Sequence, residues 1–304
     1  MAIYLGIDGG GTKTTCVVAD ETSVLGSATT GGSNITRHGN AGVREALHSA
    51  VKTACAAARV EPSQIENACI GLSGAGRPEV RDAVAGMMRE LLRGHILVVS
   101  DLETTLQAAF GNGPGVITIA GTGSIAYGRD ACGQTARAGG WGLAISDEGS
   151  GQWIGRTAVS AVLGAKDAGD DPPLLSTILN LWKLTSLDEL VRHANASPPP
   201  DFSSLFRVVL AAADAGDPLA KHVLHQAASE LAAIARNVIR RLFADGGSVP
   251  IAMSGGVFRQ SELVRQVFYN KLTAEFPQVS GHPTVVEPVR GALELARKAM
   301  AGKH

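Results

Sequence analysis

The stretch IYLGIDGGGTKTTCVVAD, residues 3–20, decides how the rest of the chain is interpreted. An apolar run ends on Asp8, three glycines follow, and a second run rich in β-branched residues begins at Thr15. Such runs are typical of strands, and glycine reaches positive φ and lets other atoms approach the backbone. The stretch therefore predicts strands over residues 3–7 and 15–19, joined by a tight turn with exposed N–H groups. Taken alone, it fits an ordinary hairpin equally well.

A second copy of this pattern lies near the middle of the chain. An apolar run over residues 116–120 leads into Gly121-Thr122-Gly123-Ser124, and a short apolar run then leads to Asp130. One glycine hairpin is usually only a turn. Two of them, each at the start of one half of the chain, predict duplicated domains that face one ligand.

Apolar strand-like runs and amphipathic helical stretches alternate over the rest of the chain, which predicts an α/β fold. Helices are expected over residues 43–59, 79–93, 147–164, 218–243 and 289–300, and strands at 68–72, 96–101 and 250–254. We expect an N-terminal domain of residues 1–112 plus 289–304 and a C-terminal domain of residues 113–288.

Composition excludes several classes of protein. The chain has 304 residues, 45% of them hydrophobic and 18% charged, which predicts two globular domains. A net charge of −1 argues against a nucleic-acid binder, and neither a signal peptide nor a membrane-length apolar run is present. The four cysteines lie far apart and show no metal-ligand spacing. We expect free thiols, no membrane partner and a cytoplasmic location.

Three glycine turns follow predicted strands, at residues 9–11, 121–123 and 255–256. Successive backbone N–H groups in such turns form concavities that bind phosphate. The spacing around Lys13 is not that of a P-loop, and no complete G-x-G-x-x-G is present. The turns therefore predict a site for an anion such as phosphate, and their spacing argues against a P-loop and against the dinucleotide-binding fold.

Two sets of motifs carry a specific resemblance. DGGGTKT, GTGS and SGGV resemble the phosphate-1, phosphate-2 and adenosine motifs of the actin, Hsp70 and sugar-kinase superfamily. A second set resembles the N-acetylglucosamine kinase group of the BadF/BadG/BcrA/BcrD ATPase family: Ser33-Asn34, Gly71-Leu72-Ser73-Gly74, Ser100-Asp101, Gly139-Gly140-Trp141-Gly142 and Asp147-Glu148-Gly149-Ser150. The resemblance spans nearly the whole chain. It implies an α/β fold of two actin-like (ribonuclease H-like) domains with an interdomain cleft.

The resemblance also assigns chemical roles. Phosphoryl transfer needs a base near the attacking hydroxyl and a metal that neutralises charge. Asp101 matches the family's catalytic base; its alternative role is to cap the helix that starts near Glu103. Asp8 is expected to hold Mg²⁺ through water molecules. In the alternative, its side chain only closes the glycine turn.

The remaining site residues follow the same matches. Those expected to contact the sugar are Asn34, Ser73, Gly74, Asp101, Ser124, Gly140, Trp141, Gly142 and Asp147. Those expected to contact ATP are Gly10, Gly11, Thr12, Lys13, Gly121, Thr122, Gly123, Ala213, Gly255 and Gly256. Three alternatives stay open: Lys13 as a solvated turn residue, Trp141 as core, and Glu148 as a helix cap instead of a hydroxyl ligand.

The implied function is ATP-dependent phosphorylation of an amino sugar, first of all N-acetylglucosamine at its 6-hydroxyl, by a homodimer. Glucosamine and N-acetylmuramic acid are competing substrates, and Arg77 or His38 could read a carboxylate on the latter. A BadF-type ATPase that activates a dehydratase is a rival, but it needs cysteines from two subunits to bridge a cluster. A nucleotide-dependent regulatory protein would leave GGWG and DEGS unexplained.

Overall fold

The computed structural model describes residues 2–244, 246–280 and 285–301. The chain forms two compact units: unit 1 is residues 1–117 with 286–304, and unit 2 is residues 118–285. The divisions expected from the sequence, after residues 112 and 288, lie close to these. The expected domains also include residues 1, 245, 281–284 and 302–304, which lie outside the described residues.

Unit 1 contains a five-stranded sheet in the order β3-β2-β1-β4-β5. Its strands are β1 (Tyr4–Gly9), β2 (Lys13–Ala19), β3 (Val24–Gly31), β4 (Asn67–Leu72) and β5 (His95–Ser100). The first three strands are antiparallel neighbours, whereas β4 is parallel to both β1 and β5. The hairpin predicted from the triple glycine is therefore confirmed. Its strands are longer than predicted, because β1 continues through Asp8 and Gly9.

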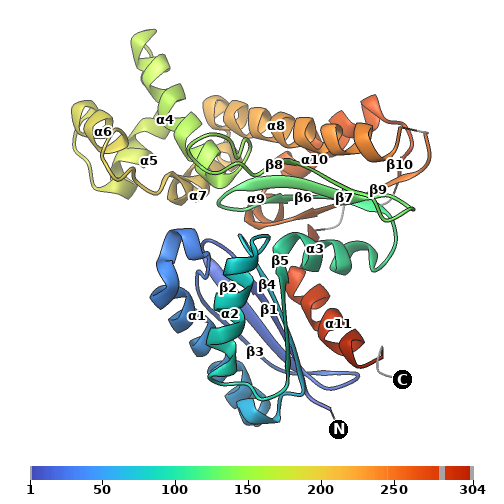
Figure 1. Cartoon of the computed structure of the whole chain (residues 1–304). Coiled ribbons are helices and arrows are strands. Elements are labelled where there is room, and N and C mark those ends of the chain that lie inside the picture. Colours follow the sequence, from blue (N-terminus) through green and yellow to red (C-terminus); the bar gives the residue numbers. More distant parts are fainter. Residues whose placement is uncertain (1, 245, 281–284, 302–304) are drawn as a thin grey trace. The chain divides into compact units, whose positions relative to one another are not determined.

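Helices cover both faces of this sheet (Figure 1). They are α1 (Ile35–Ala58), α2 (Pro78–Arg89), α3 (Asp101–Phe110) and α11 (Pro288–Ala301), with a short 3₁₀ turn at Pro62–Gln64. Ile7 and Ile70 pack with Leu47 of α1 and Met88 of α2 in one core cluster. Leu293 and Ala296 of α11 pack on the opposite face in a second cluster. Because both faces are covered, every residue of β4 is buried.

Two helix ends in unit 1 differ from the prediction. The apolar spacing predicted a helix from Val43, but α1 begins at Ile35 because the Asn34 side chain caps it. Gly39 interrupts α1 with non-helical backbone (φ 64°, ψ 174°), so the regular spacing reported only the part after the break. The helix expected over residues 79–93 ends at Arg89.

Unit 2 is built on a second sheet, in the order β10-β9-β6-β7-β8, with β11 paired to β9. Its strands are β6 (Gly115–Ala120), β7 (Ser124–Arg129), β8 (Thr135–Gly139), β9 (Val249–Ser254), β10 (Val279–Ser280) and β11 (Val285–Val286). Since β6 and β7 are neighbours on either side of Gly121-Thr122-Gly123, the second strand–turn–strand unit is also confirmed.

The helices of unit 2 include a long one, over residues 218–242, that packs on β7 and β8 (Figure 1). The helices are α4 (Gly151–Asp167), α5 (Pro173–Trp182), α6 (Leu187–Ala194), α7 (Phe206–Asp214), α8 (Pro218–Leu242), α9 (Gly256–Gln260) and α10 (Glu262–Glu275), with a 3₁₀ turn at Phe202–Leu205. The helix predicted to begin at Asp147 begins four residues later. Asp147 has a left-handed backbone (φ 66°), which cannot continue a right-handed helix, and Ser150 caps α4 instead. No helix in the described ranges is both long and apolar enough to span a bilayer.

Candidate active site

Strand register brings three predicted site segments of unit 1 to one edge of its sheet. Gly9 lies opposite Leu72 in the parallel pair of β1 and β4, and Leu72 lies opposite Ser100 in the pair of β4 and β5. The residues that follow these strands therefore emerge side by side: the glycine turn, Ser73 and Asp101. Ligands of open α/β sheets bind at this edge, beyond the carboxyl ends of parallel strands.

The glycine turn is closed by a hydrogen bond from the N–H of Gly10 to the carbonyl of Lys13 (3.0 Å). Asp8 is half-buried at the end of β1, whereas Thr12 and Lys13 are exposed. Gly9 is required for a reason other than the predicted positive φ. A Cβ there would lie 2.1 Å from Leu72 Cδ2 and equally close to Ser33 Oγ, so only glycine fits between these neighbours.

Asn34 and Ser73 meet beside this turn. The Asn34 Oδ1 accepts hydrogen bonds from the N–H groups of Thr36 and Arg37, and its Nδ2 donates to Ser73 Oγ (3.2 Å). The N–H of Ser73 in turn donates to the carbonyl of Gly9 (3.0 Å). These half-buried amide and hydroxyl groups have the chemistry that orients a ligand rich in hydroxyls.

Asp101 is the first residue of α3 but not its cap. Ser100 Oγ accepts from the N–H of Glu103 (3.4 Å), and the Glu103 carboxylate accepts from the N–H of Ser100 (3.3 Å). The capping alternative for Asp101 is therefore wrong. Burial raises the pKa of the Asp101 carboxyl to about 6, against the lowering effect of hydrogen bonds from the N–H groups of Leu102 and Asp101 itself. A carboxylate with this pKa is ionised at neutral pH and is a suitable general base.

Asp147 organises the corresponding turn of unit 2. Its side chain is buried, and its carboxylate accepts hydrogen bonds from the backbone N–H groups of Ser124 and Gly142. Desolvation raises the pKa of Asp147, with a smaller rise from Glu148. A Cβ on Gly123 would lie 2.8 Å from Asp147 Oδ2. Asp147 thus joins the second phosphate turn to the GGWG loop, a role that the sequence reasoning did not assign to it.

Trp141 is 64% exposed, so the alternative that it belongs to the core is wrong. The guanidinium carbon of Arg137, on β8, lies 4.1 Å from the centre of its ring. Gly140 and Gly142 on either side have positive φ (69° and 106°), and a Cβ on Gly140 would strike Ile125. The loop therefore presents the indole outward from unit 2. Contact between Trp141 and a sugar stays a prediction.

Glu148 does not cap α4, because the Ser150 hydroxyl accepts from the N–H of Trp153 (3.2 Å) and takes that role. The Glu148 carboxylate instead accepts from Ser146 Oγ (2.9 Å), and its backbone carbonyl accepts from Ser124 Oγ (2.7 Å). The Ser124 hydroxyl, expected at the sugar, is therefore engaged with backbone.

The segments expected at the adenosine also lie in unit 2. Gly255 follows β9 with φ 98°, and a Cβ there would lie 2.2 Å from the carbonyl of Ala120. Gly256 begins α9, so its N–H belongs to a helix N-terminus. Ala213 is buried within α7, two residues before the N–H of Ala215 closes that helix.

The residues present fit a phosphate chain and one hydrated magnesium ion. Part of each glycine turn leaves room at the backbone: nothing lies within 4 Å of a Cβ built on Gly121, and a Cβ on Gly10 would meet only the Lys13 carbonyl, at 3.8 Å. Asp8 supplies one carboxylate at the first turn, and the described parts of the chain contain no group of three potential metal ligands. Magnesium in nucleotide enzymes is held in this way, by one or two carboxylates with phosphates and water.

The model of the BadF/BadG/BcrA/BcrD ATPase family matches this chain over residues 5–296. The chain belongs to this family. A relative from Clostridium acetobutylicum, an N-acetylmuramic acid/N-acetylglucosamine kinase, is 33% identical, over 98% of this chain and 99% of the relative. An N-acetyl-D-glucosamine kinase of Dictyostelium discoideum is 29% identical, over 97% of each chain.

A solved structure from Chromobacterium violaceum, provisionally named an N-acetylglucosamine kinase, matches this BadF-family chain with a TM-score of 0.77. It is 27% identical, over 97% of this chain and 99% of the other. The predicted actin-like α/β fold class is thereby confirmed. The predicted resemblance to the N-acetylglucosamine kinase group is confirmed as well, because the two curated relatives carry this activity in their names.

The cysteines of this BadF-family member bear on the dehydratase-activating alternative. Cys16, Cys55 and Cys69 are buried in β2, α1 and β4, and Cys132 is exposed in the turn between β7 and β8. Burial raises the pKa of the Cys69 thiol to about 12. None of the four stands at the start of a helix, where the bridging cysteine of that class is expected.

Sequence reasoning missed one contact at the first turn. His38 Nε2 lies 2.9 Å from the carbonyl oxygen of Gly11. The sequence suggested His38 as a reader of a substrate carboxylate or as an ordinary surface or core residue, and no periodicity links it to a turn 27 residues earlier. The signal in the sequence was Gly39, directly after His38, because a glycine marks a possible end or break of a helix.

Proposed function

We propose that this chain is an ATP-dependent amino-sugar kinase that transfers the γ-phosphoryl group to the 6-hydroxyl of N-acetylglucosamine. The observation that carries the proposal is the carboxyl edge of unit 1, where Asp101, with its pKa of about 6, emerges beside Ser73 and the glycine turn. The named activities of the curated relatives support the same reaction and substrate class.

In the proposed reaction, Asn34 and Ser73 orient the sugar through its hydroxyl groups. The Asp101 carboxylate accepts the proton of the acceptor hydroxyl as that oxygen attacks the γ-phosphorus. The bond from that phosphorus to the oxygen bridging to the β-phosphate breaks, and ADP leaves. Backbone N–H groups of the two glycine turns bind the phosphate oxygens on which negative charge is held. Magnesium, near Asp8, supplies charge neutralisation on these oxygens when it is bound.

Three finer parts of the proposal rest on the family resemblance. They are magnesium as the metal, a homodimer as the assembly and the cytoplasm as the location. The identity of the amino sugar is also part of the proposal: N-acetylglucosamine, N-acetylmuramic acid or glucosamine. The dual name of the Clostridium relative makes the first two the leading candidates.

The test is ATP consumption with magnesium against a panel of N-acetylglucosamine, N-acetylmuramic acid, glucosamine, N-acetylmannosamine and glucose. We expect turnover on N-acetylglucosamine, and a phosphorus–proton correlation spectrum that places the phosphate on the 6-oxygen. Asp101→Asn should lower kcat by about 10²–10⁴-fold, the usual contribution of a general base.

Asp82→Asn is the matched control, because Asp82 is an exposed carboxyl on α2. It should leave kcat unchanged. Binding of ATP without turnover on any sugar would overturn the amino-sugar proposal. In that case, the iron content of the purified protein would test the dehydratase-activating alternative.

A further inference from the structure

The carbonyl groups of the triple-glycine turn of unit 1 are fixed by hydrogen bonds from other parts of the unit. Each of its three glycines accepts one hydrogen bond from a later segment: Gly9 from the N–H of Ser73 (3.0 Å), Gly10 from the N–H of Ser33 (2.9 Å) and Gly11 from His38 Nε2 (2.9 Å). A carbonyl oxygen only accepts, so Nε2 of His38 carries a hydrogen and donates it. The first two bonds use backbone donors, whereas the third depends on the side chain at position 38.

We propose that His38 is a positioning residue for the phosphate-binding turn, which it orients by donating a hydrogen bond to the carbonyl of Gly11. The inference rests on the proposed function only in taking this turn as the site of the nucleotide phosphates. His38 Nε2 does not contact a substrate carboxylate in this arrangement, because it donates to the backbone carbonyl of Gly11.

Orientation of this carbonyl matters because of peptide geometry. In a planar trans peptide, the C=O of Gly11 and the N–H of Thr12 point in opposite directions. A donor that holds the Gly11 oxygen on the α1 side therefore directs the Thr12 N–H away from α1. A turn whose amides are already oriented binds an anion without first losing conformational freedom.

Packing around the bond shows that this contact is built into the fold. A Cβ on Gly32 would lie 2.4 Å from the Gly11 oxygen and 2.6 Å from His38 Nε2, so the chain passes closely behind both groups. Gly39 then breaks the helix immediately after His38. The residues 35–38 form a separate helical turn, capped at one end by Asn34 and stopped at the other by Gly39.

This short helical turn links two segments of unit 1, one predicted to bind the sugar and one predicted to bind phosphate. Asn34 at its start bonds Ser73, a predicted sugar contact, and His38 at its end bonds the phosphate turn. Loss of the His38 bond should loosen Gly11 and Thr12 while the Asn34–Ser73 pair keeps its own hydrogen bonds. The expected defect is therefore in nucleotide affinity more than in sugar affinity.

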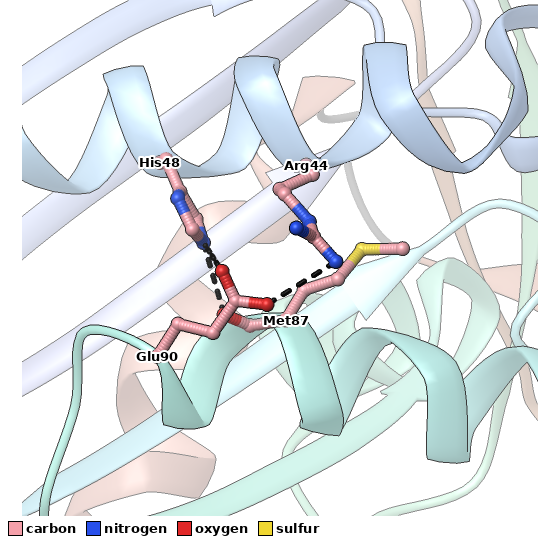
Figure 2. A network of polar contacts seen from close by, with 4 residues as sticks. All are labelled: Arg44, His48, Met87 and Glu90. Atoms are coloured by element: carbon pink, nitrogen blue, oxygen red, sulfur yellow. Dashed lines mark hydrogen bonds and ion pairs between the residues drawn. The ribbon is translucent and has the colours of Figure 1, made fainter.

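The same helix supplies a matched control. Figure 2 shows His48 of α1 reaching towards α2, where its Nε2 lies 2.9 Å from the carbonyl of Met87 and 3.8 Å from Glu90 Oε2. Arg44 pairs with the same carboxylate at 3.2 Å. His48 thus makes the same kind of bond, from an imidazole to a backbone carbonyl, with no contact at the glycine turn.

The experiment compares His38→Ala, His38→Gln and His48→Ala by calorimetric titration with MgATP and by steady-state kinetics, with circular dichroism as the check of folding. We expect His38→Ala to raise the Kd and KM for ATP about tenfold, the equivalent of one lost hydrogen bond. The KM for the sugar should change less than twofold. His38→Gln should recover most of the affinity, since a glutamine amide donates without carrying charge. His48→Ala should bind ATP like the parent chain.

Calorimetry keeps this inference separate from the proposed function. If no sugar on the panel is phosphorylated but His38→Ala still weakens ATP binding and His38→Gln restores it, the proposed function fails and the role of His38 stands. An unchanged ATP affinity in a folded His38→Ala protein would overturn the inference. So would a failure of His38→Gln to recover affinity, an equal effect of His48→Ala, or a parent chain that does not bind ATP.

Discussion

At the scale of single residues, Asp101 combines a position at the reacting edge of the sheet with a pKa raised by burial to about 6. A general base must be deprotonated to act. We expect kcat/KM to rise with pH through about 6 and to level off above it. Initial rates at saturating ATP over pH 5–8 measure this profile, with a coupling assay verified at each pH. A profile flat down to pH 5 would contradict the assignment of Asp101 as the base.

The same raised pKa makes Asp101 costly to the folded state. Its pKa is about 6 when folded, against 3.8 for an ordinary aspartate, so the folded protein binds more protons between these values. The free energy of unfolding therefore falls as pH rises from about 4 to about 6, and the full cost remains above that range. We expect Asp101→Asn to be more stable than the parent chain at pH 8, by about 1–3 kcal/mol.

Urea unfolding at pH 4.5 and pH 8 measures this difference, which should shrink at the lower pH. Asp82→Asn, which alters an exposed carboxyl, should show no such dependence. An Asp101→Asn protein that is less stable than the parent at pH 8 would mean that the hydrogen bonds from Leu102 and Asp101 outweigh desolvation.

At the scale of elements, α11 returns from the end of the chain to pack on α3, the helix that begins with Asp101. The two helices approach each other closely at Gly291, where a Cβ would lie 1.9 Å from the carbonyl oxygen of Thr104. Gly291→Ala should therefore force the helices apart and destabilise the protein by about 1–3 kcal/mol, as overpacking does. Gly86→Ala in α2 is the opposite case, since nothing lies within 4 Å of its Cβ.

Gly86→Ala should stabilise the protein by about 0.5–1 kcal/mol through helix propensity alone. Denaturant unfolding of both variants measures the contrast. Equal changes in the free energy of unfolding for the two substitutions would contradict tight packing of α3 on α11 at Gly291.

At the scale of the whole molecule, residues predicted to bind the nucleotide come from both units: Gly10 and Lys13 from unit 1, Gly121 and Gly255 from unit 2. Binding to the folded state alone should stabilise the protein by about 2.7 kcal/mol at a ligand concentration of 100 times Kd. We expect MgATP to raise the thermal midpoint and EDTA to remove most of that rise. A shift unchanged by EDTA would contradict a metal at Asp8.

The sequence alone is enough to predict the two strand–glycine turn–strand units, the alternation of strands and helices, and the family. These depend on local patterns, such as the triple glycine after Asp8 and the β-branched runs on either side, which any part of the chain carries within itself. The same patterns predicted Asp101 at the end of a strand, where the structure has the first residue of α3, and the family resemblance made it the candidate base.

The role of each polar group becomes visible in the folded chain. Ser100, not Asp101, caps α3. The Asp147 carboxylate accepts hydrogen bonds from the backbone N–H groups of Ser124 and Gly142. His38 reaches a turn 27 residues away, and Gly9 is needed for room beside Leu72. Hydrogen bonds and close packing join residues that are distant in the chain, and their geometry is set by strand register and helix placement, which no local pattern encodes.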